Sequence, residues 1–162
     1  MATRSVSIFK NPVPANGARV ASLSEFASAR RYSTGAVHFP DTEGAEVQLA
    51  FPIPSDYAGS PVFELFLGSI GADQTTRWQL EYNAVSEFQT YDPASADETL
   101  NQNEGEGSNP LRLRKVTLAA TAGNFAADDL CLLNIIRLSN AAADSSFAGV
   151  MLADVIFRYS DV

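Results

Sequence analysis

Few side chains in this 162-residue sequence could carry covalent or metal chemistry, because it holds one histidine, His38, and one cysteine, Cys131. That count excludes a disulfide framework and a Cys/His zinc site. Cys131 lies between Leu130 and Leu132, where burial raises a thiol pKa and leaves a poor nucleophile. His38 lies in a short apolar run of its own. We interpret both as packing residues and predict no catalytic residue.

Residues 87–110 form a long polar stretch with six acidic residues and no basic residue. Carboxylate oxygens are the ligands that calcium prefers, and a mobile loop can wrap an ion. The spacing matches no EF-hand loop, so we favour a solvated acidic loop and keep a calcium site as the alternative. Paired carboxylates can also hydrolyse glycosides, but a chain this acidic produces such pairs by chance. We therefore predict no metal, no cofactor and no enzymatic activity.

Sequence signatures of phosphate binding and of hydrolases are missing, since neither a glycine-rich phosphate loop nor a Gly-x-Ser-x-Gly elbow occurs. Two groups remain that could contact a partner. Arg112, Arg114 and Lys115 could meet an acidic surface, although we favour a solvated strand face. Trp78 and Tyr82 could stack on a sugar ring, but aromatic residues at this spacing are more often core residues.

Alternating and apolar runs predict that β-strands position these residues. The predicted strands are 46–51, 62–70, 77–85, 111–121, 129–139 and 150–160. Alternation places Trp78 and Tyr82 on the inward face of 77–85, and Met151 and Tyr159 on one face of 150–160. With turn signals between the strands and no convincing long helix, the pattern predicts an all-β, antiparallel β-sandwich of the jelly-roll type. An immunoglobulin-type sandwich is the alternative.

The first 31 residues differ in charge from the rest of the chain. They hold five basic residues and one acidic residue, a net of +4, whereas the other 131 hold six basic and eighteen acidic, a net of -12. Pro12 and Pro14 make their first half rich in turns, and Leu23–Arg31 could form a short helix. We interpret 1–33 as an N-terminal arm that precedes a domain at 34–162. The alternative is a segment that packs along that domain.

Overall composition is that of a globular protein, with 46% hydrophobic and 19% charged residues and a net charge of -8. An acidic chain is a poor partner for nucleic acid. No run approaches the roughly 20 apolar residues that a membrane helix needs, and the N-terminus lacks an apolar signal segment. We expect synthesis in a cytoplasm and neither nucleic-acid nor membrane partners.

Several segments resemble small jelly-roll virion proteins of tailed bacteriophages. The resemblance covers about residues 37–160, and its segments are 39–57, 61–67, 77–82, 127–138 and 155–159. A Pro-x-Asp-Tyr turn at Pro54–Tyr57 and a terminal strand with Arg158 and Tyr159 are its most characteristic motifs. The resemblance implies a non-enzymatic structural protein of the particle, often a trimer, that decorates the capsid or belongs to the tail.

The resemblance and the basic arm together predict a capsid decoration, or cement, protein on the virion surface, synthesised in the host cytoplasm. Such a protein self-associates, as a trimer, and binds the major capsid protein; exposed sheet edges also favour self-association. A flexible cationic segment can order on an acidic surface and add a strand to a neighbouring sheet. The predicted capsid-contact residues are Arg4, Ile8, Phe9, Lys10, Arg19, Arg30 and Arg31.

The assignment to a capsid decoration protein predicts the effect of removing the arm, and it has one alternative. Deleting residues 1–31 should abolish particle binding and leave the fold intact. The alternative function is a tail-associated carbohydrate- or receptor-binding module, whose exposed aromatic contacts would be Trp78, Tyr82 or Tyr91.

Overall fold

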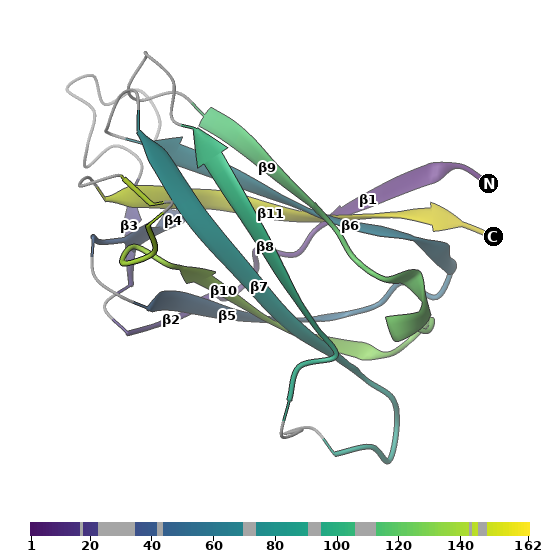
Figure 1. Ribbon diagram of the computed structural model, residues 1–162. Helices are drawn as coiled ribbons and strands as arrows, with labels where there is room; N and C mark the ends of the chain where they lie inside the picture. Colours follow the sequence, from purple (N-terminus) through teal and green to yellow (C-terminus); the bar gives the residue numbers. More distant parts are fainter. Residues whose placement is uncertain are drawn as a thin grey trace.

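The structure, a computed structural model (Figure 1), describes residues 1–16, 18–22, 35–41, 44–69, 74–90, 95–105, 113–142, 144–145 and 149–162. These residues form β-strands and a short 3-10 helix, η2 (Ala122–Asn124). The strands make two antiparallel sheets that pack face to face, which confirms the predicted antiparallel β-sandwich. Within the described ranges, no helix has the length and apolar character needed to cross a membrane.

The two sheets are named A and B. Sheet A has the strand order β3 (Arg19–Ser22), β4 (Gly35–Phe39), β11 (Val150–Asp161), β6 (Tyr57–Ser69) and β9 (Leu113–Ala119), and β1 (Thr3–Ser7) also pairs with β11. Sheet B has the order β2 (Val13–Ala15), β5 (Ala45–Pro52), β10 (Leu130–Arg137), β7 (Thr75–Val85) and β8 (Glu98–Gly105). From β4 onward, the chain is made of four two-strand units, β4–β5, β6–β7, β8–β9 and β10–β11. In each unit, one strand belongs to sheet A and the other to sheet B. This arrangement is that of a jelly roll, as predicted.

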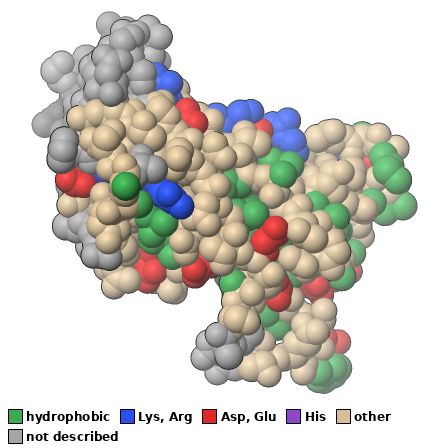
Figure 2. Space-filling model, viewed as in Figure 1, with side chains coloured by type: hydrophobic (Ala, Val, Ile, Leu, Met, Phe, Trp, Pro, Cys, Tyr) green, Lys and Arg blue, Asp and Glu red, His purple; other side chains and the backbone are tan. Residues whose placement is uncertain are grey.

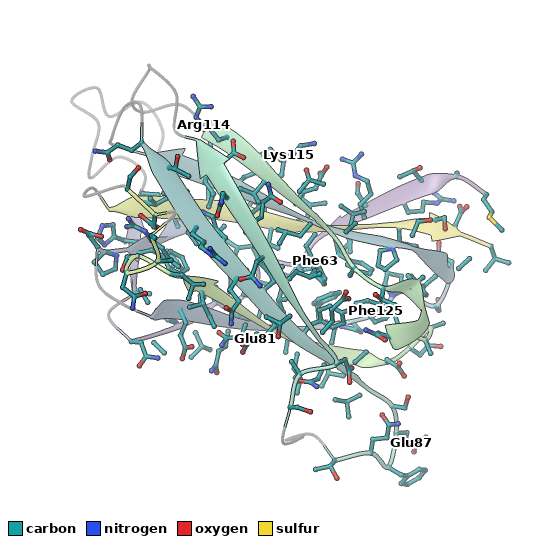
Figure 3. The ribbon with its side chains drawn as sticks, viewed as in Figure 1. Phe63, Glu81, Glu87, Arg114, Lys115 and Phe125 are labelled. Carbon is teal, nitrogen blue, oxygen red and sulfur yellow. The ribbon has the colours of Figure 1, made fainter. Side chains whose placement is uncertain are left out.

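The core forms because alternate residues of each strand point between the sheets. Trp78, Leu80 and Tyr82 of β7 are buried there, as the alternation of this strand predicts. Phe63 and Phe125 point into the same layer (Figure 3). The ring centroids of Phe63 and Phe157 lie 5.4 Å apart. Such aromatic contacts add about 0.5–1.5 kcal/mol each to the free energy gained by burying the rings.

Strand β11 departs from the predicted alternation. Its pairing with β6 shifts register between Leu152 and Asp154. Because one residue is added at this bulge, the core face passes from Leu152 to Val155 and then continues to Tyr159. Met151, predicted to share a face with Tyr159, lies outside the core cluster although it is buried. The prediction of one uninterrupted face over 150–160 was therefore wrong.

The acidic stretch 87–110 is also more ordered than predicted. Its residues 98–105 form β8, which pairs with β7 from Tyr82↔Glu98 to Thr75↔Gly105. Leu100 packs against the core, while most other β8 side chains are polar and exposed, so the strand gave a weak hydrophobic signal. The rest of the described stretch belongs to the β7–β8 loop, whose described residues 86–90 and 95–97 project away from the sandwich in Figure 1.

The described part of the N-terminal segment lies along the sandwich, as the alternative interpretation proposed. Strand β1 pairs with β11, β2 with β5, and β3 with β4. Ile8 is 3% exposed and belongs to the core. The described residues among 1–31 therefore contribute strands to both sheets, so deletion of 1–31 should not leave the fold intact. The possible helix at 23–31 and the boundary at 33/34 lie outside the described residues.

Candidate functional site

A groove of about 1070 Å³ lies over the outer face of sheet B. Its floor comes from β5, β10 and β7. Lys10 and Asn11, which precede edge strand β2, line one side, and Ser95 and Ala96 of the β7–β8 loop line the other. In Figure 2 this loop stands out from the body of the sandwich. The groove exists because these two segments rise beside the sheet.

Strand register brings the polar floor residues together. Gln48, Asn134 and Glu81 are direct neighbours on β5, β10 and β7, and they point away from the core. Figure 3 shows Glu81 on the side of β7 that faces away from sheet A. Neighbouring strands are about 4.8 Å apart, so these side chains form one continuous row.

Beside this polar row, the outer face of sheet B becomes apolar. The next row along the strands, which also lines the groove, is Ala50, Leu132 and the amide Asn83. The row after it, outside the groove lining, is Pro52, Leu130 and Val85. Leu130 is among the exposed large hydrophobic residues of the described chain. The floor therefore offers amide and carboxylate groups next to an apolar strip.

The amide of Asn134 lies at the centre of the polar row. Its Nδ2 donates a hydrogen bond of 3.1 Å to Glu46 Oε2. Its Oδ1 is shielded from solvent and has no hydrogen-bond partner among the described residues. An unpaired buried acceptor costs about 1–3 kcal/mol, and a ligand donor relieves this cost only if the side chain turns so that Oδ1 faces the groove.

Hydrogen bonds hold the β7–β8 loop at its base. Asn83 Nδ2 donates to the backbone oxygen of Ser95 at 3.0 Å, and the Ala84 amide donates to Asp97 Oδ2 at 2.8 Å. Ser86 Oγ donates to Asp129 Oδ1 at 2.6 Å. These bonds position Ser95 and Ala96 as one side of the groove.

The two residues first considered for catalysis lie on different sheets. Cys131 is in β10 of sheet B, and burial raises the pKa of its thiol. His38 is in β4 of sheet A, on the face away from the core. A methyl group added at Gly149 would lie 2.0 Å from His38 Nε2, so the imidazole packs against that glycine. Both residues pack within the protein, in agreement with their interpretation from the sequence.

Within the described ranges, no group of three or more His, Cys, Asp or Glu side chains could hold a metal ion. Residues 91–94 and 106–110 of the acidic stretch lie outside those ranges, so its calcium alternative stays open. Glu98 of this stretch has a structural position, because its Oε2 accepts hydrogen bonds from Tyr82 Oη at 2.5 Å and from the Thr121 amide at 2.8 Å. Burial favours the neutral acid, but these bonds outweigh it and lower the pKa of Glu98.

Neither Trp78 nor Tyr82 can be an exposed sugar-stacking residue, because they are 0% and 1% exposed. Trp78 Nε1 instead donates a hydrogen bond of 2.9 Å to Thr76 Oγ1. That part of the predicted carbohydrate-binding alternative was wrong, and Tyr91 lies outside the described residues.

Lys115, one of the basic residues of β9, forms an ion pair within this chain. Lys115 Nζ lies 2.7 Å from Glu64 Oε1, and Arg158 Nη2 lies 2.8 Å from Glu64 Oε2. Burial raises the pKa of Glu64, which is 3% exposed, but these two cations outweigh that effect and lower it. The acidic partner of Lys115 is therefore Glu64 of the same chain. Arg112 lies outside the described residues.

The predicted capsid-contact residues differ in exposure and position, and they do not form one common surface among the described residues. Arg4 is exposed and pairs through Nε with Asp161 Oδ2 at 2.8 Å. Ile8 is buried and Phe9 packs against the core, so these two side chains are turned toward their own domain. Lys10 lines the groove. Arg19 begins β3, and Arg30 and Arg31 lie outside the described residues.

Sequence reasoning missed the groove residues Gln48, Glu81 and Asn134. The available signal was a polar residue at the outward position of three strands that are otherwise apolar or alternating. That signal says nothing of which strands are neighbours, so it could not align the three side chains.

No family model matches the sequence, and no curated protein is similar to it in sequence. Solved structures with a similar fold include the CBM22-1 xylan-binding domain of Xyn10C from Paenibacillus barcinonensis, with 10% identity, 98% of this chain and 94% of that chain covered, and a TM-score of 0.54. The CBM36-1 domain of a multidomain xylanase from the hindgut metagenome of Trinervitermes trinervoides is also similar, with 10% identity and a TM-score of 0.51. The match covers 99% of this chain and 100% of that chain. An exo-β-1,3-galactanase from Phanerochaete chrysosporium has 12% identity and a TM-score of 0.52, with 98% of this chain but only 30% of that chain covered. At these identities the likeness establishes the β-sandwich fold.

Proposed function

We propose that this chain is a non-catalytic carbohydrate-binding module that holds a glycan in the groove over sheet B. The observation that carries the proposal is the groove floor, where the polar row of Gln48, Asn134 and Glu81 lies beside an apolar strip. Sugars present hydroxyl groups around the ring edge and C–H groups on the ring faces. Amides both donate and accept hydrogen bonds, so they suit hydroxyl groups, while Leu132 and Ala50 suit the ring face.

Two further observations support the proposal. The groove volume of about 1070 Å³ is slightly above the roughly 300–1,000 Å³ typical of small-molecule sites, enough for several sugar residues. The fold is also one that a xylan-binding domain uses.

The test is native affinity electrophoresis of the full chain through gels that contain single soluble polysaccharides, followed by isothermal titration calorimetry. We expect at least one polysaccharide to retard the protein and Asn134→Ala to abolish most of that retardation. Asn103→Ala is the matched control, because Asn103 is an exposed amide on edge strand β8 outside the groove lining. Unaltered mobility of the wild-type protein in every gel, neutral and charged, would contradict the proposal.

The capsid decoration function, with a trimer and the major capsid protein as partner, stays a prediction. We place it second because Ile8 and Phe9, two of its proposed contacts, pack within their own domain. Localising the tagged chain in purified particles tests it: an even distribution over the shell would support decoration, and a tail location would agree with a carbohydrate-binding module.

A further inference from the structure

We infer that the groove accepts uncharged glycans and discriminates against acidic ones, such as polymers of uronic acids. This inference rests on the proposed function and specifies the ligand class of the same site. It follows from which charged groups lie at the floor, which lie at its margin, and where the cations of the sandwich are placed.

The floor carries negative charge. Glu81 belongs to the polar row, and Glu46 lies one row further along β5, hydrogen-bonded to Asn134. Among the described lining residues, Lys10 supplies the positive charge, and it lies beyond the β2 edge of the floor. A glycan carboxylate at the centre of the floor would therefore meet the carboxylate of Glu81, with that of Glu46 one row away and outside the groove lining. Repulsion of this kind is strong where water is partly excluded.

The cations that could offset this charge lie elsewhere on the sandwich. Acidic ligands are usually held by arginine or lysine side chains that reach the carboxylate directly. Figure 3 places Arg114 and Lys115 on the opposite side of the molecule from Glu81 and Glu87. In Figure 2, acidic side chains likewise gather toward the margin that carries the β7–β8 loop. Arg77 is on the same face as Glu81 but outside the groove lining.

The remaining floor groups suit hydroxyl groups. Gln48, Asn134 and Asn83 are amides, and each can accept from one hydroxyl and donate to another. Asn134 Oδ1 has no hydrogen bond to give up, but it is shielded from solvent, so the side chain must turn before a ligand hydroxyl can donate to it. Glu81 Oε1 already accepts a 2.6 Å bond from Gln79 Nε2, which holds the carboxylate in place as an acceptor for further hydroxyls. Binding therefore depends on uncharged donors and on the apolar strip.

The experiment compares two sets of polysaccharides with the full-length protein: neutral xylan, β-glucan, mannan and galactan, against polygalacturonate, alginate and hyaluronan. Affinity electrophoresis and calorimetry are run at low salt, where charge repulsion is least screened. We expect binding to at least one neutral polymer and at least tenfold weaker binding to every acidic one. Tighter binding to an acidic polymer would overturn the inference and leave the proposed function standing, whereas no binding in either set would overturn both.

Three variants link the discrimination to the floor. Glu81→Gln keeps size and hydrogen bonding, so neutral binding should change less than about threefold while acidic polymers gain at least threefold at low salt. Asn134→Ala should weaken neutral binding about tenfold, the loss expected for one hydrogen bond of about 1.4 kcal/mol. If Asn134→Ala has a cooperative thermal transition below that of the wild type, Gln48→Ala, at an exposed position of β5, replaces it. Unchanged discrimination in Glu81→Gln would contradict the assigned role of this carboxylate.

Discussion

The outer faces of the two sheets use their polar side chains in different ways. On sheet A, the nearly buried Glu64 is paired with Lys115 and Arg158, so both of its carboxylate oxygens are satisfied within the chain, although Arg158 Nε is shielded and has no hydrogen-bond partner among the described residues. On sheet B, Asn134 keeps an unpaired acceptor in a groove, with Gln48 and Glu81 beside it. Both outer faces are formed in the same way, by the outward-pointing residues of strands whose inward-pointing residues are apolar.

This difference between the two faces indicates that polar residues of sheet A serve mainly stability, whereas those of sheet B serve mainly ligand binding. A paired buried charge contributes to folding and offers little to a ligand, because a ligand would have to displace its partners. An unpaired amide costs folding free energy and can regain it from a ligand. Substitutions of Glu64 and its partners on sheet A should therefore change the free energy of unfolding, and substitutions in the groove should change affinity.

The largest effect on stability should come from β1, the strand that completes sheet A beside β11. Ile8→Ala removes a core side chain next to that strand and should lower the free energy of unfolding by about 2–5 kcal/mol. The exposed Ser5→Ala on β1 is the control and should change it by less than about 0.5 kcal/mol. Chemical denaturation measures both. Equal stability of the Ile8 variant and the wild type would show that this segment is an independent arm.

A smaller effect is expected from the charged centre of sheet A. Glu64→Gln removes two charge-assisted hydrogen bonds, but Lys115 and Arg158 are partly exposed and regain water. We therefore expect a loss of about 1–2 kcal/mol near neutral pH.

The pH dependence of this loss has a definite sign. The pKa of Glu64 is lowered from its ordinary value of 4.5 in the folded protein. Its contribution to stability is then complete above pH 4.5 and disappears as the pH falls through the lower folded-state pKa. Denaturation curves of the wild type and Glu64→Gln should converge as the pH falls below 4.5. A difference of constant size down to strongly acidic pH would contradict the role given to this carboxylate.

The smallest effect on stability is expected in the groove of sheet B. Gln48→Ala should change the free energy of unfolding by less than about 0.5 kcal/mol and weaken glycan binding several-fold. Its counterpart on sheet A is Thr117→Ala, an exposed outward residue of β9 that should change neither quantity. Thermal denaturation and calorimetry on the same samples provide the comparison. A large stability loss with intact affinity in Gln48→Ala would remove the distinction between the two faces.

Most strands could be predicted from the sequence, because the alternation in 46–51 and 77–85 is a local property of the chain. β8 was missed for the same reason: apart from Leu100, its side chains are mainly polar, so its pairing with β7 stabilises a strand that its own pattern does not indicate. The bulge in β11 was missed because the register between β11 and β6 depends on both strands at once.

The candidate site was less predictable than the fold. Lys10 was singled out for its charge, but its position beside the groove follows from the pairing of β2 with β5. Gln48, Asn134 and Glu81 are 33 to 86 residues apart in sequence. Nothing local relates them.

The sequence by itself determined the all-β class, the inward faces of most strands and the burial of Cys131, because hydrophobic alternation acts within a few residues. Tertiary structure alone decided that the N-terminal strands complete the sheets, that Glu64 lies between two cations, and that three polar side chains form one row in a groove. These features depend on which strands become neighbours, and that choice is made by the long-range packing of the whole sandwich.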